Sequence, residues 1–284
     1  MNLSLQQKSV RIAILLALSI PYSMPFIWMV LTSLKTDTQI FPTEGGSISL
    51  MSWENFWPNP FDFENYPDTL ESVPFLLYTK NSMLVSFFSV VGAVASSAVV
   101  AYGFARMQFK WKEPLFLLVL ATMALPTQVT MIPQFILFKW LGWHGTFLPL
   151  IVPFFFGVPF FIFLMRQFFR TFPEEIFEAA RIDGASEWKI FITIVLPLSK
   201  PVLATCALFQ LMHSWNDFLG PLLYLNNPED YTLAYGLQQF VSAYGGEWAQ
   251  LMAASTMFTL PVVLLFFVIQ KTFIQGIATT GGKN

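Results

Sequence analysis

Long apolar stretches alternate with short polar ones along the chain. Five of them contain no Asp, Glu, Lys or Arg: 12–34, 81–105, 114–138, 140–165 and 248–270. A sixth, 201–228, is interrupted only by Asp217. Each exceeds the roughly 20 apolar residues that a helix needs to cross a bilayer. The pattern predicts an all-α integral membrane protein with six spans, at about 11–34, 80–105, 114–139, 146–168, 200–225 and 249–271.

Several predicted spans contain prolines, and the second contains the small residues GAVASSA, from Gly92 to Ala98. Membrane bundles tolerate proline where neighbouring groups satisfy the freed carbonyls, so we expect kinks and some non-helical backbone. Small residues four apart let helices approach closely, and packing within the chain is the simplest interpretation.

The charge distribution predicts how the chain is oriented. Only 11% of the residues are charged, whereas a soluble domain carries roughly 25%. Twelve of the 15 basic residues flank alternate loops, which predicts that both termini and the polar segment at about 170–199 are cytoplasmic. The first apolar stretch is too long for a signal peptide and lacks an A-x-A-like cleavage site, so we expect it to be retained. We expect one transmembrane domain over 1–284.

Two predicted external loops leave alternatives open. The first, about 36–79, is acidic and rich in aromatic residues and proline, which fits an interfacial aromatic belt or a docking surface for an external protein. The last, about 226–248, holds aromatic residues that would contact substrate or a partner, or cap the bundle: Tyr231, Tyr235, Tyr244 and Trp248.

The polar segment at about 170–199 has helical order. Thr171 and Glu174 have the spacing of a capping box that starts a helix. That helix places Glu174, Glu178 and Arg181 on one stripe, and Gly184 is suited to stop it in a left-handed conformation. The opposite side holds Ile176, Ala179 and Ala180. A second helix is predicted from near Ser186 until Leu196-Pro197 ends it. Amphipathic helices of this kind commonly just lie on a membrane surface.

The order Glu178-Ala179-Ala180, three residues, Gly184, nine residues, Ile194, one residue, Leu196-Pro197 resembles the cytoplasmic EAA loop of ABC importer permeases. Further stretches resemble the carbohydrate (maltose-type) branch, and within it the G-type subunit of maltose permeases: AYGFARMQF, LPTQVTMIPQF, WNDFLGPL and the terminal FIQGIATTGGKN. The closing TTGGKN departs from the run in which relatives often end. The likeness covers nearly the whole chain from about residue 10, apart from the first external loop.

The resemblance implies a permease subunit of an ATP-driven, binding-protein-dependent sugar importer that works by alternating access. The implied partners are a second permease chain in a heterodimer, two ATP-binding subunits, an extracytoplasmic sugar-binding protein and the lipid bilayer, in a bacterial or archaeal inner membrane. The residues implied to couple to the ATPase are Glu178, Ala179, Ala180, Arg181, Asp183 and Gly184. We therefore call 170–199 the coupling segment.

The chain lacks a G-x-x-x-x-G-K-[ST] motif, so we expect ATP and Mg²⁺ on separate subunits and a transport subunit without catalysis or cofactor. His144 and His213 show no metal-ligand spacing, and we expect no metal site and no nucleic-acid partner.

Asp217 is the one acid inside a predicted span, which makes it a functional candidate. With Trp215 and Asn216 it would suit stacking and hydrogen bonding to sugar hydroxyls. Alternatively, a neighbouring helix or loop backbone satisfies it, and His213, four residues earlier, is expected to pair with it.

Two alternatives compete with a sugar importer: the same class of importer for another polar solute, and an ion-coupled secondary carrier. An importer of an anionic solute such as glycerol 3-phosphate would favour a basic group in its path, and the apolar interiors of the spans hold none. An ion-coupled secondary carrier would need ionisable residues or broken helices near the midplane, and a docking loop would be superfluous to it. An intramembrane enzyme lacks a nucleophile and base.

Overall fold

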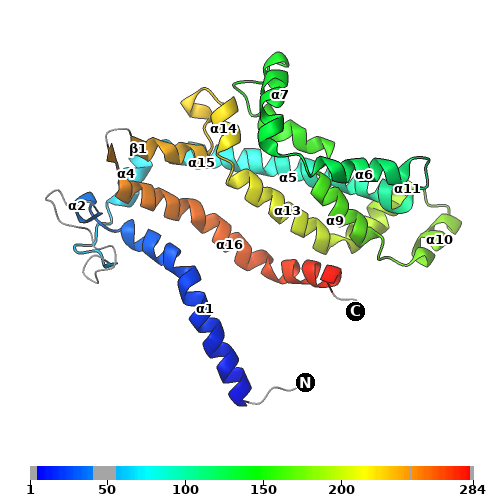
Figure 1. Cartoon of the computed structure of the whole chain (residues 1–284), viewed down its shortest axis with the longest axis horizontal. Helices are drawn as coiled ribbons and strands as arrows, with labels where there is room; N and C mark the ends of the chain where they lie inside the picture. The colour runs from blue at the N-terminus through cyan, green and yellow to red at the C-terminus, as the bar shows by residue number, and fades with distance from the viewer. Residues whose placement is uncertain (1–4, 41–55, 243–244, 282–284) are drawn as a thin grey trace. The chain divides into compact units, whose positions relative to one another are not determined.

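The computed structural model describes residues 5–40, 56–242 and 245–281, which are helical almost throughout (Figure 1). Its only strands in these ranges are β1 (Val241–Ser242) and β2 (Gly245–Gly246), a two-residue antiparallel pair. The helical fold class is therefore confirmed. Residues 41–55 of the acidic external loop, and Tyr244, lie outside the described ranges.

The chain divides into two compact units, one of residues 1–76 with 236–261 and one of residues 77–235 with 262–284. We call them unit 1 and unit 2. The long helix α16 (Trp248–Gly281) contributes to both. That the whole chain acts as one transmembrane domain stays a prediction.

Side-chain hydrogen bonds to the ends of helices hold unit 1. Its elements, besides β1, β2 and the first part of α16, are α1 (Leu5–Thr32), α2 (Asp37–Ile40), α4 (Asn65–Ser72) and η4 (Leu237–Phe240). Asn65 Nδ2 donates to the carbonyls of Ser33 at 3.1 Å and Lys35 at 2.9 Å, just past the end of α1. Asp37 Oδ1 accepts from the amide of Ala249, at the start of α16, at 3.1 Å. The described part of the first external loop is thus folded onto helix ends.

Unit 2 contains most of the helices. Its longest is α5 (Phe75–Arg106), whose first two residues belong to unit 1. The next are α6 (Lys112–Thr122), α7 (Thr127–Trp140), α8 (Leu148–Ile151), η1 (Val152–Phe156) and α9 (Pro159–Phe169). The coupling segment follows with α10 (Glu174–Ile182), α11 (Glu187–Ile190), a π-helical η2 (Phe191–Val195) and α12 (Leu196–Leu198). The remainder are α13 (Lys200–Trp215), α14 (Leu219–Tyr224), η3 (Pro228–Asp230) and α15 (Leu233–Gly236).

The described residues contain four helical stretches that are long and apolar enough to cross a membrane, or up to six if each of two bent pairs is one span. The four are Ser9–Thr32, Phe75–Arg106, Leu148–Phe169 and Trp248–Phe267. One bent pair, α6 with α7, turns by 96° just before Pro126, which agrees with a proline break in the predicted span 114–139. The other joins Glu187–Leu198 to α13 at 78°.

Proline also produces the expected non-helical backbone within the predicted span 146–168. Between η1 and α9 the chain is extended, and Gly157 has a φ of +92°. The small residues of α5 hold this segment, because Ser96 Oγ donates to the Phe154 carbonyl at 3.0 Å and Ser97 Oγ accepts from the Val158 amide at 2.9 Å. The interpretation of GAVASSA as packing within the chain is confirmed.

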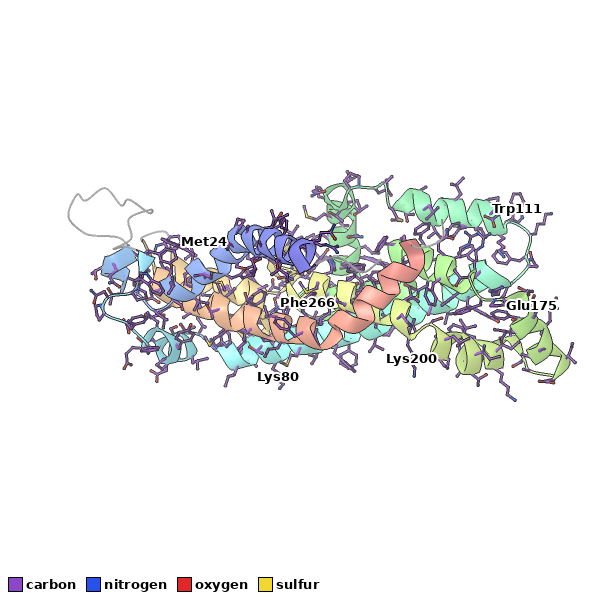
Figure 2. All side chains as sticks on the ribbon, turned by 90° about the horizontal axis from the view of Figure 1, so that it is seen from below. Met24, Lys80, Trp111, Glu175, Lys200 and Phe266 are labelled. Carbon is purple, nitrogen blue, oxygen red and sulfur yellow. The ribbon has the colours of Figure 1, made fainter. Side chains whose placement is uncertain are left out.

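The core of unit 2 extends into the coupling segment. Met165 and Phe169 of α9, Phe177 of α10 and Ile190 of α11 are all fully buried in one cluster with α5 and α13. Figure 2 shows Trp111 and Glu175 at the same end of unit 2 and Lys80 well away from them. The coupling helices therefore form part of the packed interior at one end of α5, next to the turn that leads into α6.

Candidate coupling segment and candidate substrate site

The first coupling helix, α10, starts without the predicted capping box. It begins at Glu174 after an extended Pro173, and no side chain caps it. The Thr171 hydroxyl donates instead to the Phe168 carbonyl at 2.7 Å, at the end of α9. The prediction was wrong because Thr171 still belongs to the turn that closes the preceding helix, so Pro173 alone directs the chain into α10.

The buried side of α10 is rotated by about one residue from the predicted one. Phe177 is 0% exposed and Ala180 is 9% exposed, whereas Ile176 is 38% and Ile182 is 86% exposed. Ala179 is also exposed, so only Ala180 of the predicted apolar side is buried. The large Phe177 ring determines the inward side, because it fits under the guanidinium of Arg106 with 4.0 Å between Cζ and the ring centroid.

Gly184 ends α10 as predicted. Its φ is +78°, and its amide donates to the Arg181 carbonyl while the Ala185 amide donates to the Ala180 carbonyl, both at 3.0 Å. These are the two hydrogen bonds of a Schellman motif, which favours glycine at the left-handed position. The bend between the two coupling helices therefore has a defined geometry.

The second coupling helix begins as predicted and ends later. Ser186 caps it, since its hydroxyl accepts from the Lys189 amide at 3.3 Å. The helix continues through Pro197 to Leu198, one residue beyond the predicted end. The π turn of η2 ends at Val195, shortly before Pro197. Because proline removes a backbone hydrogen bond, the helix widens in this turn and does not stop.

Most of the predicted coupling residues face outward. Glu178, Ala179, Arg181, Asp183 and Gly184 are exposed, and Ala180 is buried. Ile182, which lies among them, is the most exposed large hydrophobic residue of the described chain. An apolar side chain surrounded by charged ones has the composition of a protein-docking surface.

Arg181 also takes part in a charged cluster with α5. Its Nε donates to Glu187 at 2.8 Å and its Nη1 to Glu174 at 3.3 Å, and the hydrogen bond to Glu187 raises the pKa of Arg181 above its usual value. Glu174 also accepts from Arg106 at 2.6 Å. The sequence reasoning missed Arg106 and Glu187 as site residues. The available signal was the i, i+4 spacing of Tyr102 and Arg106 within AYGFARMQF.

The candidate substrate residues lie at a break between helices. The predicted span 200–225 is interrupted after Trp215, where α13 ends, and α14 starts at Leu219. Asp217 Oδ1 accepts from the Gly220 amide at 3.0 Å, which is the bond that an N-terminal cap makes. Asn216 Nδ2 donates to the Met212 carbonyl at 2.7 Å. Loop and helix backbone therefore satisfy both polar side chains.

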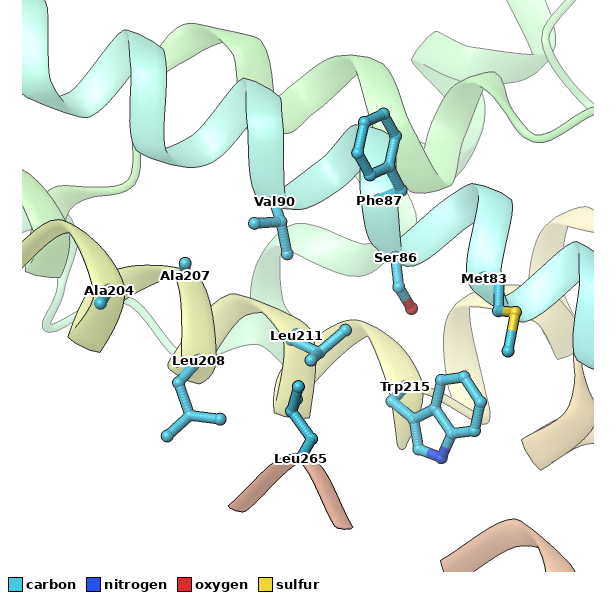
Figure 3. A pocket seen from close by; sticks show the side chains of 10 residues that line it. All are labelled: Met83, Ser86, Phe87, Val90, Ala204, Ala207, Leu208, Leu211, Trp215 and Leu265. Atoms are coloured by element: carbon cyan, nitrogen blue, oxygen red, sulfur yellow. The ribbon is translucent and has the colours of Figure 1, made fainter. Parts of the chain in front are cut away.

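Trp215 lies in the wall of a cavity of about 620 Å³. Figure 3 shows the cavity between α5 and α13, and its lining includes Met83, Ser86, Phe87, Leu208, Leu211 and Trp215. The lining is apolar except for groups such as the Ser86 hydroxyl, which has no hydrogen-bond partner. Of the three residues predicted to act together, Trp215 lines this cavity, and Asn216 and Asp217 are not part of its lining.

The two histidines have separate surroundings. His213 packs edge-on against Phe154, with ring centroids 5.8 Å apart, and does not pair with Asp217, because α13 ends between them. His144 Nδ1 lies 3.1 Å from Asn226 Nδ2. Among the residues that the structure describes, no three His, Cys, Asp or Glu side chains are arranged to hold a metal ion.

The described part of the last external loop caps α5. Asn81 Nδ2 donates to the carbonyls of Glu229 at 2.8 Å and Tyr231 at 3.0 Å. The rings of Tyr231 and Tyr235 lie 4.3 Å apart between centroids. For these two tyrosines the arrangement favours the capping alternative.

With this geometry established, residues 90–279 match the model of a family described as binding-protein-dependent transport system inner membrane component. The chain belongs to this family. It is therefore a multi-pass membrane protein of the cell membrane, and the resemblance to ABC importer permeases is confirmed.

Individual relatives agree over nearly the full length. The chain is 33% identical to the arabinooligosaccharides transport system permease protein AraQ of Bacillus subtilis over 94% of this chain and 92% of that protein. It is 30% identical to the lactose transport system permease protein LacG of Rhizobium radiobacter over 89% and 88%. A bacterial ABC transporter involved in alginate import has the same fold, with a TM-score of 0.79 at 23% identity over 96% of this chain and 99% of that one.

Proposed function

We propose that the chain is the permease subunit of an ATP-driven importer of oligosaccharides or related sugars. The family supports the importer class, and relatives named for arabinooligosaccharide and lactose transport support a sugar substrate. The observation that supports the coupling role is the exposed surface of α10. This helix ends at a fixed turn at Gly184, and its exposed surface has Ile182 at its centre. The chain itself has no ATP-binding motif and no catalytic role, so ATP and Mg²⁺ belong to partner subunits.

The membrane arrangement that fits this role has six spans and cytoplasmic termini. Besides the four long helices, α6 with α7 then counts as one span and α13 with α14 as another, which leaves α11 outside the membrane. Arg106, Lys110, Lys112 and the coupling segment lie together on the side that the positive-inside rule assigns to the cytoplasm. In a bacterial or archaeal inner membrane, the opposite side faces the sugar-binding protein.

Transport proceeds by alternating access in a complex with a second permease and two ATP-binding subunits. Closure of the ATP-bound subunits moves α10 and α11, and the helices that follow open the path outward. This requires that ATP bind the outward-open state better than the inward-open one, because a ligand shifts an equilibrium only by its differential affinity.

A neutral sugar fits the described interior better than an anion such as glycerol 3-phosphate. Arg166 is buried in α9, but its guanidinium is paired with Glu113 at 2.9 Å and donates to the Phe104 carbonyl at 3.2 Å. It is therefore not available as an anion-binding group. In this proposal Trp215 lines the path, and Asn216 and Asp217 shape it through the backbone bonds that they make.

The test is to purify the chain with its partner permease and ATP-binding subunits and to reconstitute the complex in vesicles. Sugar-binding-protein-stimulated ATP hydrolysis and uptake are measured for wild type, Glu178→Ala and Gly184→Trp, with co-purification of all subunits as the assembly control. Arabinooligosaccharide, lactose and glycerol 3-phosphate are compared as substrates, with and without ATP and with an imposed proton gradient.

We expect sugar uptake that requires ATP and binding protein, and we expect it to collapse in Gly184→Trp. Uptake driven by the proton gradient alone would establish a secondary carrier. Unchanged stimulation in both variants would mean that α10 and α11 merely lie on the membrane surface, and the coupling role would be withdrawn.

A further inference from the structure

Arg106, the last residue of α5, connects this helix to the end of α9 and to α10. Its side chain is only 8% exposed. One terminal nitrogen donates to Glu174 of α10 at 2.6 Å, and the other donates to the carbonyls of Phe169 at 2.6 Å and Phe172 at 2.7 Å. Its plane covers the ring of Phe177. The end of α5 is thereby connected to the end of α9 and to the first coupling helix.

Tyr102, one turn earlier on α5, makes the corresponding connection to the second coupling helix. Its hydroxyl donates to Glu187 Oε2 at 2.6 Å, and Glu187 Oε1 accepts from Arg181 at 2.8 Å. Arg181 leads back to Glu174, which Arg106 holds. We call these five side chains the Arg106 network: Tyr102, Arg106, Glu174, Arg181 and Glu187. It forms a closed circuit through α5, α10 and α11.

The members of the Arg106 network differ in how much they contribute to the connection between α5 and the coupling helices. The bonds from Arg181 to Glu174 and Glu187 are partly exposed and contribute little, since exposed ion pairs are typically weak. Arg106 and Tyr102 are largely buried, and the planar fork of Arg106 serves a carboxylate and two carbonyls at once. The mechanical connection therefore depends on the two α5 residues.

We propose that Arg106 and Tyr102 are positioning residues that fasten both coupling helices to α5, so that a displacement of the coupling segment moves α5. This inference rests on the proposed function, because it assumes that an ATP-binding subunit moves α10. It adds that α5 is the membrane helix that receives the movement. Because α5 also lines the 620 Å³ cavity through Met83, Ser86 and Phe87, the connection leads from the ATPase side to the interior of unit 2.

The chain offers a matched control in Arg166. It is equally buried, lies 3.8 Å from the Phe116 ring, forms one ion pair and donates to one backbone carbonyl. These contacts join α9 to α5 and α6, and neither Phe104 nor Glu113 belongs to α10 or α11. Arg→Lys at either position keeps the charge and removes the fork.

The experiment compares Arg106→Lys with Arg166→Lys in the reconstituted complex and measures sugar taken up per ATP hydrolysed. We expect Arg106→Lys to lower this ratio by about tenfold, the factor equivalent to ~1.4 kcal/mol, and Arg166→Lys to leave it unchanged. A fluorophore at Met83 of α5 should report ATP binding in wild type and Arg166→Lys, and its signal should be lost in Arg106→Lys.

Tyr102→Phe removes one hydroxyl and keeps the inference testable if Arg106→Lys does not assemble. We expect it to lower the ratio by about two- to fivefold, with Tyr22→Phe, an exposed tyrosine of α1, as its control. Glu187→Ala should lower the ratio at least as much as Tyr102→Phe, because Glu187 also accepts from Arg181. Adding Tyr102→Phe to Glu187→Ala should cause no further fall, because the acceptor of the Tyr102 hydroxyl is already gone. An unchanged ratio in Arg106→Lys or Tyr102→Phe, or an equal fall in Arg166→Lys, would overturn the inference. Failure of the wild-type complex to couple uptake to ATP would instead overturn the proposed function.

Discussion

The coupling segment joins its helices with charged side chains, whereas the break at Asn216–Phe218 joins α13 to α14 with local hydrogen bonds to the backbone. In the first, Glu174 receives bonds from two arginines on two different helices. In the second, Asp217 bonds a backbone amide three residues away. A network that reaches three helices is suited to transmit a displacement, and a cap within one turn fixes the shape of a bend. The two candidate sites therefore have different physical roles.

The largest effect on stability is expected at the buried side of the coupling segment. Phe177→Ala removes a fully buried ring and should lower the free energy of unfolding in detergent by about 3–5 kcal/mol. Ile182→Ala, on the exposed side of the same helix, should change it by less than about 0.5 kcal/mol while weakening binding of the ATP-binding subunit. Equal losses of stability in the two variants would contradict the assignment of the two sides of α10.

The next effect concerns the tight approach at the Asp217 break. A Cβ at Gly220 would collide with the Asp217 carboxylate and lie 2.8 Å from Leu150 Cδ2. Gly220→Ala should therefore lower the free energy of unfolding by about 1–3 kcal/mol. Gly103→Ala is the control, because nothing lies within 4 Å of its Cβ and alanine favours the α5 helix. If Gly220→Ala were as stable as Gly103→Ala, the close contact would not exist.

Local patterns in the sequence predicted most of the helices and one turn. The errors arose where the structure depends on contacts between residues far apart in the chain. Gly184 and Ser186 act as predicted, because a left-handed stop and an N-cap depend on neighbouring residues only. The inward side of α10 was predicted wrongly because Phe177 packs against Arg106, which lies 71 residues earlier in the chain. Periodicity within the helix carries no information about that partner.

The break at 216–218 was missed for a related reason. Hydropathy treats 201–228 as one apolar stretch, and the cap that Asp217 gives α14 depends on a glycine that tolerates close approach. The break after α6 was easier to anticipate, because proline at 126 disrupts a helix by itself. The Arg106 network could be suspected only from the spacing of Tyr102 and Arg106, since its other members lie far along the chain.

Gly184 can matter in two ways, through its left-handed backbone conformation and through its place at the bend between the coupling helices, and a comparison with Gly142 distinguishes them. Gly184 and Gly142 both have positive φ, +78° and +71°, and both have open space around the Cβ position. Alanine at either should cost about 1–2 kcal/mol from the left-handed backbone alone. Only Gly184→Ala should also lower binding-protein-stimulated ATP hydrolysis, and Gly184→Asn should restore part of the stability. Loss of stimulation in Gly142→Ala as well would show that reduced stability, and not the coupling bend, explains the effect.

The smallest expected effect decides whether Asp217 is a cap or a substrate ligand. Asp217→Ala removes the acceptor for the Gly220 amide and should lower the free energy of unfolding by about 1 kcal/mol. Asp217→Asn keeps an oxygen at the same position, so its stability should remain close to wild type. If the carboxylate only caps α14, sugar uptake by Asp217→Asn should also match wild type.

If Asp217 bound sugar directly, Asp217→Asn would change sugar uptake without changing the free energy of unfolding. A carboxylate accepts hydrogen bonds from sugar hydroxyls more strongly than an amide oxygen does, because bonds to charged groups contribute roughly twice as much. Asp217→Asn would then raise the KM for uptake and leave the free energy of unfolding unchanged. If Asp217 is only a cap, uptake should fall only in variants whose free energy of unfolding also falls. Because the carboxylate already accepts from a backbone amide within its own turn, we expect stability and uptake to change together.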